Sequence, residues 1–184
     1  MPVQRKKSVS RRAMVQTKGK DAIALLKQDH VTVKKLLKQL ESAEDSGTRE
    51  ELLEKVEIEI KIHTTIEEEI FYPAFREATK TEKEEKMYFE AMEEHHVVDL
   101  VMPEIKGTDA DDETFPAKVK VLKDLIEHHA EEEEEGVMFP KAQRLLGAEE
   151  LRTLGQQMQE RKQELMDEYG VETAPPRTRR RRAA

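Results

Sequence analysis

The chain has 184 residues, 39% of them charged and none of them cysteine, and its formal net charge is −8. This length suffices for one domain with a hydrophobic core, and the lack of cysteine excludes disulfides, iron–sulfur clusters and thiol catalysis. No apolar run approaches the roughly 20 residues that span a bilayer, and the basic N-terminus lacks the apolar stretch of a signal peptide. We therefore expect a cytoplasmic protein.

The net charge hides two basic ends around an acidic middle. Residues 1–20 contain seven Lys or Arg, residues 175–184 contain five Arg, and neither segment contains an acid. The middle therefore carries all 40 acids against the remaining 20 bases. Both ends are poor in large apolar side chains, so we expect residues 1–20 and 171–184 to form disordered tails. Such tails are expected to attract polyanions, either DNA or anionic lipid, without sequence preference.

Apolar residues recur at helical spacing along the chain, and no segment alternates with the period of a strand. The first predicted helix starts near Asp21 and ends at a break at Ser46-Gly47. A capping-box pattern over residues 48–51 opens the second helix, which reaches Pro73. Proline removes a helical hydrogen bond, so we expect a kink or an end at that position.

A second capping-box pattern, at Thr81–Glu84, opens the third predicted helix, which runs to a break at Pro103–Gly107. Residues 109–114 form a loop, and the fourth helix runs from about Phe115 past Pro140. Gly147 separates a fifth helix, at about residues 149–169. The pattern predicts an all-α protein with an up-down-up-down four-helix bundle at residues 21–143 and an additional C-terminal helix at residues 144–170.

One pattern occurs twice. Residues 60–69 match residues 126–135 in chemical kind, and a proline follows each copy, Pro73 in the first and Pro140 in the second. Each copy places a His and a Glu four residues apart, which puts both side chains on one face of a helix. The repeat extends upstream, because Asp29-His30 in the first half matches Glu94-His95 in the second. Two such halves facing each other would bring several imidazoles and carboxylates together.

The second copy contains two adjacent histidines, and helical phase allows either of two pairs to face the core: His128 with Glu132, or His129 with Glu133. Aligning the two copies favours the second pair, because it matches His63 and Glu67 of the first copy. This alignment requires one inserted residue in the second copy, which we place at Gly136.

These side chains indicate a metal site. A buried carboxylate without a partner costs several kcal/mol, and two carboxylates in one core repel each other, so cations would relieve both problems. Four His nitrogens and two carboxylates suit two bridged ions, and the absence of sulfur ligands favours iron or manganese over structural zinc. A single His–Glu pair is weak evidence in a chain this rich in Glu, but five of the six histidines fit the repeat. Asp99, one turn after His95, is a candidate to orient that imidazole.

These stretches resemble the hemerythrin-like HHE cation-binding family, which is named for His, His and Glu ligands that occur twice. The resemblance spans about residues 21–143. It implies a hemerythrin-like four-helix bundle with a non-haem di-iron centre of two iron ions, which binds dioxygen or related small molecules. By residue match it implies the ligands His30, His63, Glu67, His95, His129 and Glu133.

We therefore expect a metal-binding protein whose di-iron centre binds or senses dioxygen, nitric oxide or peroxide, or handles iron. One alternative is a di-iron enzyme that decomposes peroxide, although no acid or base outside the predicted ligands stands out as catalytic. Another alternative is an interaction protein that binds polyanions through its basic tails.

Overall fold

A computed structural model describes residues 19–171 of the chain, so the predicted tails lie almost entirely outside the described residues. The described part is helical and contains no strand. None of its helices is both long enough and apolar enough to cross a membrane. The elements in chain order are α1 (Ala22–Ser42), α2 (Ser46–Ile66), η1 (Glu67–Phe71), α3 (Tyr72–Ala78), α4 (Glu82–Lys106), α5 (Phe115–Glu127), η2 (His128–Met138) and α6 (Phe139–Glu168), where η marks a π-helical segment.

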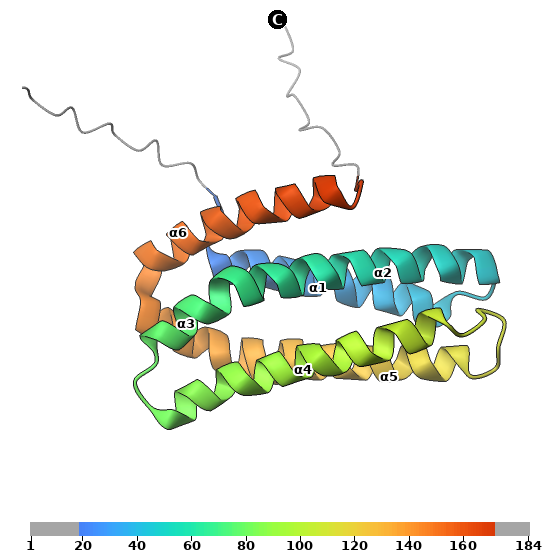
Figure 1. Cartoon of the computed structure of the whole chain (residues 1–184), viewed down its shortest axis with the longest axis horizontal. Coiled ribbons are helices and arrows are strands. Elements are labelled where there is room, and N and C mark those ends of the chain that lie inside the picture. Colours follow the sequence, from blue (N-terminus) through green and yellow to red (C-terminus); the bar gives the residue numbers. More distant parts are fainter. Residues whose placement is uncertain (1–18, 172–184) are drawn as a thin grey trace, which may run out of the picture.

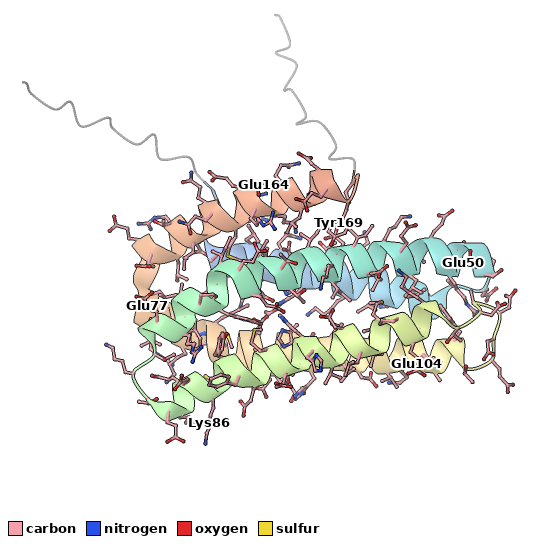
Figure 2. All side chains as sticks on the ribbon, viewed as in Figure 1. Glu50, Glu77, Lys86, Glu104, Glu164 and Tyr169 are labelled. Atoms are coloured by element: carbon pink, nitrogen blue, oxygen red, sulfur yellow. The ribbon has the colours of Figure 1, made fainter. Side chains whose placement is uncertain are left out.

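Four long helical rods form the bundle that the sequence predicts (Figure 1). The rods run up and down in chain order: α1, then α2 continued by η1 and α3, then α4, then α5 continued by η2 and the start of α6. Charged side chains cover the outside, as Figure 2 shows for Glu50, Glu77 and Lys86. The rest of α6 leaves the bundle and packs against α1 and α2.

Side-chain caps set where the helices begin. Asp45 accepts a hydrogen bond of 2.8 Å from the backbone N–H of Thr48, which makes Asp45 the N-cap of α2. The predicted break at Ser46-Gly47 is therefore wrong, because both residues lie in the first turn of α2. The predicted capping box of α4 is confirmed. The Glu84 N–H donates to Thr81 Oγ1 at 3.3 Å, and the Thr81 N–H donates to Glu84 Oε2 at 3.2 Å.

Each π-helical segment precedes a proline. The helical rod does not end at Pro73, because Pro73 lies in the first turn of α3, where the missing N–H of proline costs little. Just before the proline, the N–H of Tyr72 donates to the carbonyl of Glu67, five residues back, where an α-helix would use the residue four back. The second copy repeats this geometry, with the N–H of Phe139 bonded to the carbonyl of Glu134 ahead of Pro140. A π-turn holds one more residue than an α-turn, so it changes which side chains face the core.

Two glycines shape the C-terminal helix. Gly147 has φ 76°, in the region that favours glycine, and it divides α6 where the sequence predicts a boundary. Gly155 lies so close to the start of α1 that an added Cβ would be 2.5 Å from the carbonyl oxygen of Lys20. Only glycine permits this approach, so the second part of α6 (residues 148–168) is held against the N-terminal end of α1.

A polar layer separates two apolar clusters in the bundle. Along α1, Leu26 belongs to one cluster, Val33 belongs to the other, and buried His30 lies between them in sequence. The same order holds along α4, where His95 lies between Ala91 and Val98. Buried histidines and carboxylates thus occupy one level of the core, flanked by aliphatic and aromatic side chains on both sides.

Candidate metal centre

Six buried side chains from all four rods converge at the polar level of the core. They form two overlapping groups in which one potential ligand atom of each residue lies within 4.8 Å of the others: His30, His63, Glu67 and Glu134 in one, and Glu67, His95 and His129 in the other. We call His30 with His63 the first half-site and His95 with His129 the second half-site. Glu67 belongs to both groups, and Glu134 approaches the second half-site at 3.7 Å from His129 Nε2.

Three of the four imidazoles are anchored from outside by a carboxylate on Nδ1. The distances are 2.8 Å for His30 to Glu135, 2.8 Å for His95 to Glu68 and 2.6 Å for His129 to Glu94. Such a contact keeps the proton on Nδ1, directs the lone pair of Nε2 inward and makes the imidazole a better metal ligand. The fourth contact is looser, because His63 Nδ1 lies 3.8 Å from Asp29 Oδ2.

The inward atoms are those that a cation would satisfy. His63 Nε2 and Glu67 Oε1 are buried without a hydrogen-bond partner. The same holds for His30 Nε2 and Glu134 Oε2, which lie 3.0 Å apart but do not have hydrogen-bond geometry. His95 Nε2 and His129 Nε2 face each other at 3.1 Å. Burial lowers the pKa of His129, but Glu134 and Glu94 raise it above its ordinary value, so a proton bridges the two Nε2 atoms in place of a cation. Buried polar atoms are almost always paired, so the donor set of imidazoles and carboxylates fits metal ions.

The pKa values of the two central carboxyl groups, Glu67 and Glu134, are shifted in opposite directions. Burial and repulsion from Glu134 raise the pKa of Glu67 well above its ordinary range. Burial also disfavours the charged form of Glu134, but the nearby histidines, His129 foremost, hold the pKa of that carboxyl below its ordinary range. Without a cation, the pair therefore holds about one negative charge instead of two. Added positive charge would allow both to ionise.

Glu134, and not the predicted Glu133, faces the centre. The side chain of Glu133 is 37% exposed, with Oε1 3.8 Å from Nε2 of exposed His128. Glu134 is fully buried, with Oε2 3.0 Å from His30 Nε2. The physical reason is η2, whose wider turn places the fifth residue after His129 on the inner face, where an α-helix would place the fourth. The choice of His129 over His128 agrees with the geometry, because His129 is buried.

The prolines carry the signal that the alignment missed. Glu67 lies six residues before Pro73, and Glu134 lies six residues before Pro140. Counting back from the prolines thus pairs the two central carboxylates and puts the extra residue between His129 and Glu134, not at Gly136. The same count pairs Glu68 with Glu135, the two carboxylates that hold a histidine of the opposite half.

Asp99 does not orient His95 as the sequence suggests. Its side chain is 61% exposed and pairs with Lys61 at 3.5 Å. Glu68 takes that place, with Oε1 2.8 Å from His95 Nδ1. The partner comes from η1, a different rod, so spacing along α4 did not reveal it. His96 is exposed.

Tyr72 is a site residue that the sequence analysis did not identify. Its buried hydroxyl donates to Glu134 Oε1 at 3.0 Å and lies 3.4 Å from His95 Nε2. At the matching position of the second copy, Phe139 stacks on His30 with ring centroids 5.8 Å apart. A hydroxyl thus faces the centre beside the second half-site and a phenyl ring beside the first.

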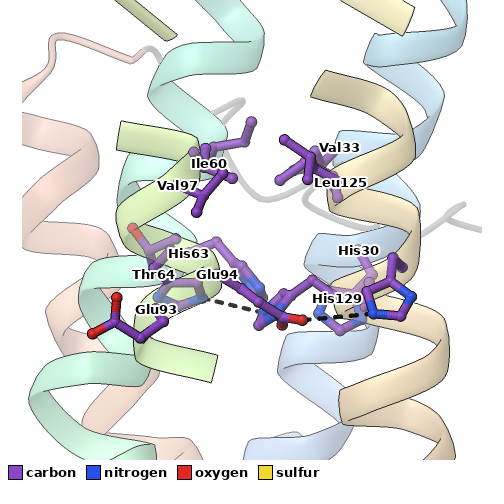
Figure 3. Close-up of a pocket in the computed structure, with 15 residues that line it drawn as sticks. His30, Val33, Ile60, His63, Thr64, Glu93, Glu94, Val97, Leu125 and His129 are labelled. Carbon is purple, nitrogen blue, oxygen red and sulfur yellow. Dashed lines mark hydrogen bonds and ion pairs between the residues drawn. The ribbon is translucent and has the colours of Figure 1, made fainter. Parts of the chain in front are cut away.

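A cavity of about 180 Å³ adjoins the centre and is lined by members of the apolar cluster that contains Val33, whereas Tyr72 belongs to the other apolar cluster. Figure 3 shows the imidazoles on one side of the cavity and Val33, Ile60, Val97 and Leu125 on the other. Glu93, Glu94 and exposed His128 also line the cavity, so it reaches the surface between α4 and η2. The space suits a small molecule next to the ligand atoms.

The chain matches a known protein family. The family model described as the Hemerythrin HHE cation binding domain matches residues 21–142. One solved structure is similar along most of both chains: a Hemerythrin HHE cation binding domain-containing protein from Mycobacterium kansasii, an Rv2633c homolog. It is 28% identical in sequence, with a TM-score of 0.72 over 81% of this chain and 89% of the other. No curated protein shows a significant match.

Proposed function

Since this chain belongs to the hemerythrin HHE cation binding domain family and is a metal-binding protein, we propose that it holds a non-haem di-iron centre that binds a small oxidant or diatomic molecule. The observation that carries the proposal is the set of unpaired inward atoms on His30, His63, Glu67 and Glu134. They converge with His95 and His129 around two carboxylates. Histidine and carboxylate without thiolate is a donor set typical of iron and manganese.

The central carboxylates and the imidazoles would have different roles in holding the ions. Glu67 and Glu134 lie between the two half-sites, so they would help to hold both ions and cancel part of their charge. The imidazoles would complete each half-site, held in place by carboxylates on Nδ1. Six protein ligands for two ions would leave room for a small exogenous molecule. When bound, iron would supply reversible binding of, or electron exchange with, dioxygen, nitric oxide or peroxide.

The cavity supports a small guest. About 180 Å³ next to four imidazoles admits a diatomic molecule or peroxide, and its largely apolar lining limits the water that would compete. Tyr72 contributes from the other apolar cluster, because its hydroxyl donates to Glu134 and holds that carboxylate toward the centre. A hydrogen bond of this kind to a charged group is worth about 1.5–3 kcal/mol.

The direct test is the absorption spectrum of the iron-loaded protein with dioxygen, nitric oxide or peroxide added. Protein reconstituted with ferrous iron in the absence of air should show a new absorption band on adding dioxygen, nitric oxide or peroxide. The Glu134→Gln variant should lose that band, while Glu133→Gln should keep it, because only Glu134 faces the centre. Iron-loaded protein whose spectrum responds to none of the three guests would contradict this proposal and leave iron handling as the role of the site.

Peroxide decomposition is the competing activity of the same centre. A binding or sensing protein should change its spectrum with peroxide and then stop. Sustained release of dioxygen from peroxide, abolished in Glu134→Gln, would favour the enzyme. We also propose that the basic ends of the chain bind polyanions, on the evidence of their twelve Lys and Arg without a single acid. A cytoplasmic location stays a prediction.

A further inference from the structure

A buried lysine of α6 contacts Asp29, a carboxylate that lies beside a ligand histidine of the metal centre. Lys162 lies in the second part of α6, and its Nζ is 2.6 Å from Oδ1 of Asp29 in α1. The lysine is 9% exposed and the aspartate 5% exposed. Lysine is almost never buried unless its charge is paired, so this contact fixes both side chains. The contact also adds to the close packing of Gly155 that holds α6 on α1.

Asp29 is at the same time the outer partner of His63. Its second oxygen, Oδ2, lies 3.8 Å from His63 Nδ1, and neither atom has a hydrogen-bond partner. Asp29 is therefore a carboxylate that a lysine and a histidine share, and it lies closer to the lysine.

The second half-site has no such competitor. Glu94, which precedes His95 as Asp29 precedes His30, contacts His129 Nδ1 at 2.6 Å. Within residues 19–171, its other charged contact is half-exposed His128, at 3.7 Å. The repeat thus gives equivalent carboxylates to His63 and His129, but only the carboxylate of His63 is shared with a buried lysine.

This difference bears directly on metal affinity. A carboxylate on Nδ1 increases the basicity of the imidazole and fixes its ring, and losing such a partner typically costs 10–100-fold in metal affinity. The ammonium group of Lys162 neutralises Asp29 and holds it away from His63. His63 should therefore be the weakest of the four nitrogen donors.

We propose that Lys162 makes the two half-sites unequal, so that the second half-site fills first and the first half-site binds its ion more weakly. Lys162 acts as a positioning residue, through Asp29, on His63. It lies beyond residues 21–142, the part that the family model matches, so the additional helix of this chain adjusts the metal centre. The inference rests on the proposed binding of two ions.

The test is a ferrous iron titration of the full-length protein in the absence of air, with a competing chelator. Wild-type protein should bind two ions in two steps that differ at least about tenfold in affinity. His63→Ala should abolish only the weaker step, and His129→Ala should abolish the tighter one. In Lys162→Met, Asp29 becomes free to contact His63. The weaker step should then tighten about tenfold, while the tighter step changes by less than about twofold.

Two further variants separate this effect from simple loosening of α6. Arg161 is the neighbour of Lys162 and pairs with Glu69 at 2.7 Å, so Arg161→Met removes another ion pair of the helix without touching Asp29. It should leave both steps unchanged. The double variant Asp29→Asn/Lys162→Met removes the buried carboxylate together with its lysine and should return the weaker step to its wild-type affinity. If Lys162→Met fails to fold, Lys162→Gln removes the same charge while keeping a polar group beside Asp29, and it should tighten the weaker step in the same way.

The iron titrations separate the proposed role of Lys162 from the proposed di-iron centre. Two equal steps in wild-type protein, or no tightening in Lys162→Met, would overturn the inference while leaving the di-iron centre intact. The same tightening in Arg161→Met would overturn it too, because the cause would then be helix docking. If the double variant keeps a tightened weaker step, Asp29 is not the link and the inference fails. Wild-type protein that binds fewer than two ions would contradict the proposed function itself.

Discussion

The hydroxyl of Tyr72 donates a hydrogen bond of 3.0 Å to Oε1 of Glu134, which joins the two halves of the repeat at the metal centre. The matching residue of the second half is Phe139, which has no hydroxyl. The centre is therefore asymmetric on the side of Tyr72 and Phe139, although the ligands themselves are related by a nearly two-fold repeat.

Replacing Tyr72 with Phe should keep the fold, because Phe139 shows that a phenyl ring fits the equivalent position. Iron content should stay near two per chain, while Glu134 loses its donor. We expect a shifted absorption spectrum of the iron-loaded protein and a loss of about 1–3 kcal/mol in the free energy of unfolding. Tyr88→Phe is the control, since Tyr88 packs against Tyr72 without a hydrogen bond to the centre. Indistinguishable spectra for Tyr72→Phe and wild type would contradict this role.

The assignment of Glu134 predicts a sharp contrast between neighbours. Glu134→Gln should lose most of the iron, because it replaces a carboxylate at the centre by a neutral amide. Glu133→Gln should retain iron, since that side chain is 37% exposed and faces His128. Metal analysis of the two purified variants decides the matter. Iron loss in Glu133→Gln alone would mean that η2 is an ordinary α-helix in solution.

Much of the fold follows from local patterns. The Thr81–Glu84 capping box predicts the start of α4 because it uses only contacts within one turn. Gly147 marks a boundary because its φ of 76° favours glycine. The start of α2 was misplaced because Asp45 caps it three residues before the predicted capping box.

The centre was only partly predictable. The internal repeat and its one-turn spacing of His and Glu predict His30, His63, Glu67, His95 and His129, and the structure brings all five together. Glu134 did not follow, because residues 131–135 are all Glu and only the width of the turn decides which one faces inward. Tyr72 and Lys162 act across the fold, so no spacing along the chain reveals their partners.

The outer carboxylates give a third prediction. Glu94→Gln should lower iron affinity roughly 10–100-fold, because the amide cannot match the carboxylate that His129 Nδ1 meets at 2.6 Å. Glu93→Gln is the matched control, since Glu93 lines the cavity without contacting a ligand imidazole. Affinities from chelator competition test this prediction, and equal effects of the two changes would remove Glu94 from the centre.

The basic ends should be separable from the metal centre. Deleting residues 1–20 and 175–184 should leave iron content and helicity unchanged, because all the proposed ligands lie between residues 30 and 134. Retention on DNA at low ionic strength should disappear, since the deletion removes twelve positive charges. Salt-dependent binding to DNA and to anionic vesicles measures this effect. If the full-length chain shows no retention on either polyanion, the ends do not bind polyanions.

Two metal ions should bind at the two central carboxylates, Glu67 and Glu134, in the core of the bundle. The most direct measurement is the iron content of protein reconstituted with ferrous iron in the absence of air, for wild type and for His63→Ala/Glu67→Ala. The wild type should hold about two iron ions per chain, and the double variant should lose most of the iron, because Glu67 belongs to both groups of ligand atoms. Full iron loading of the double variant would contradict the account.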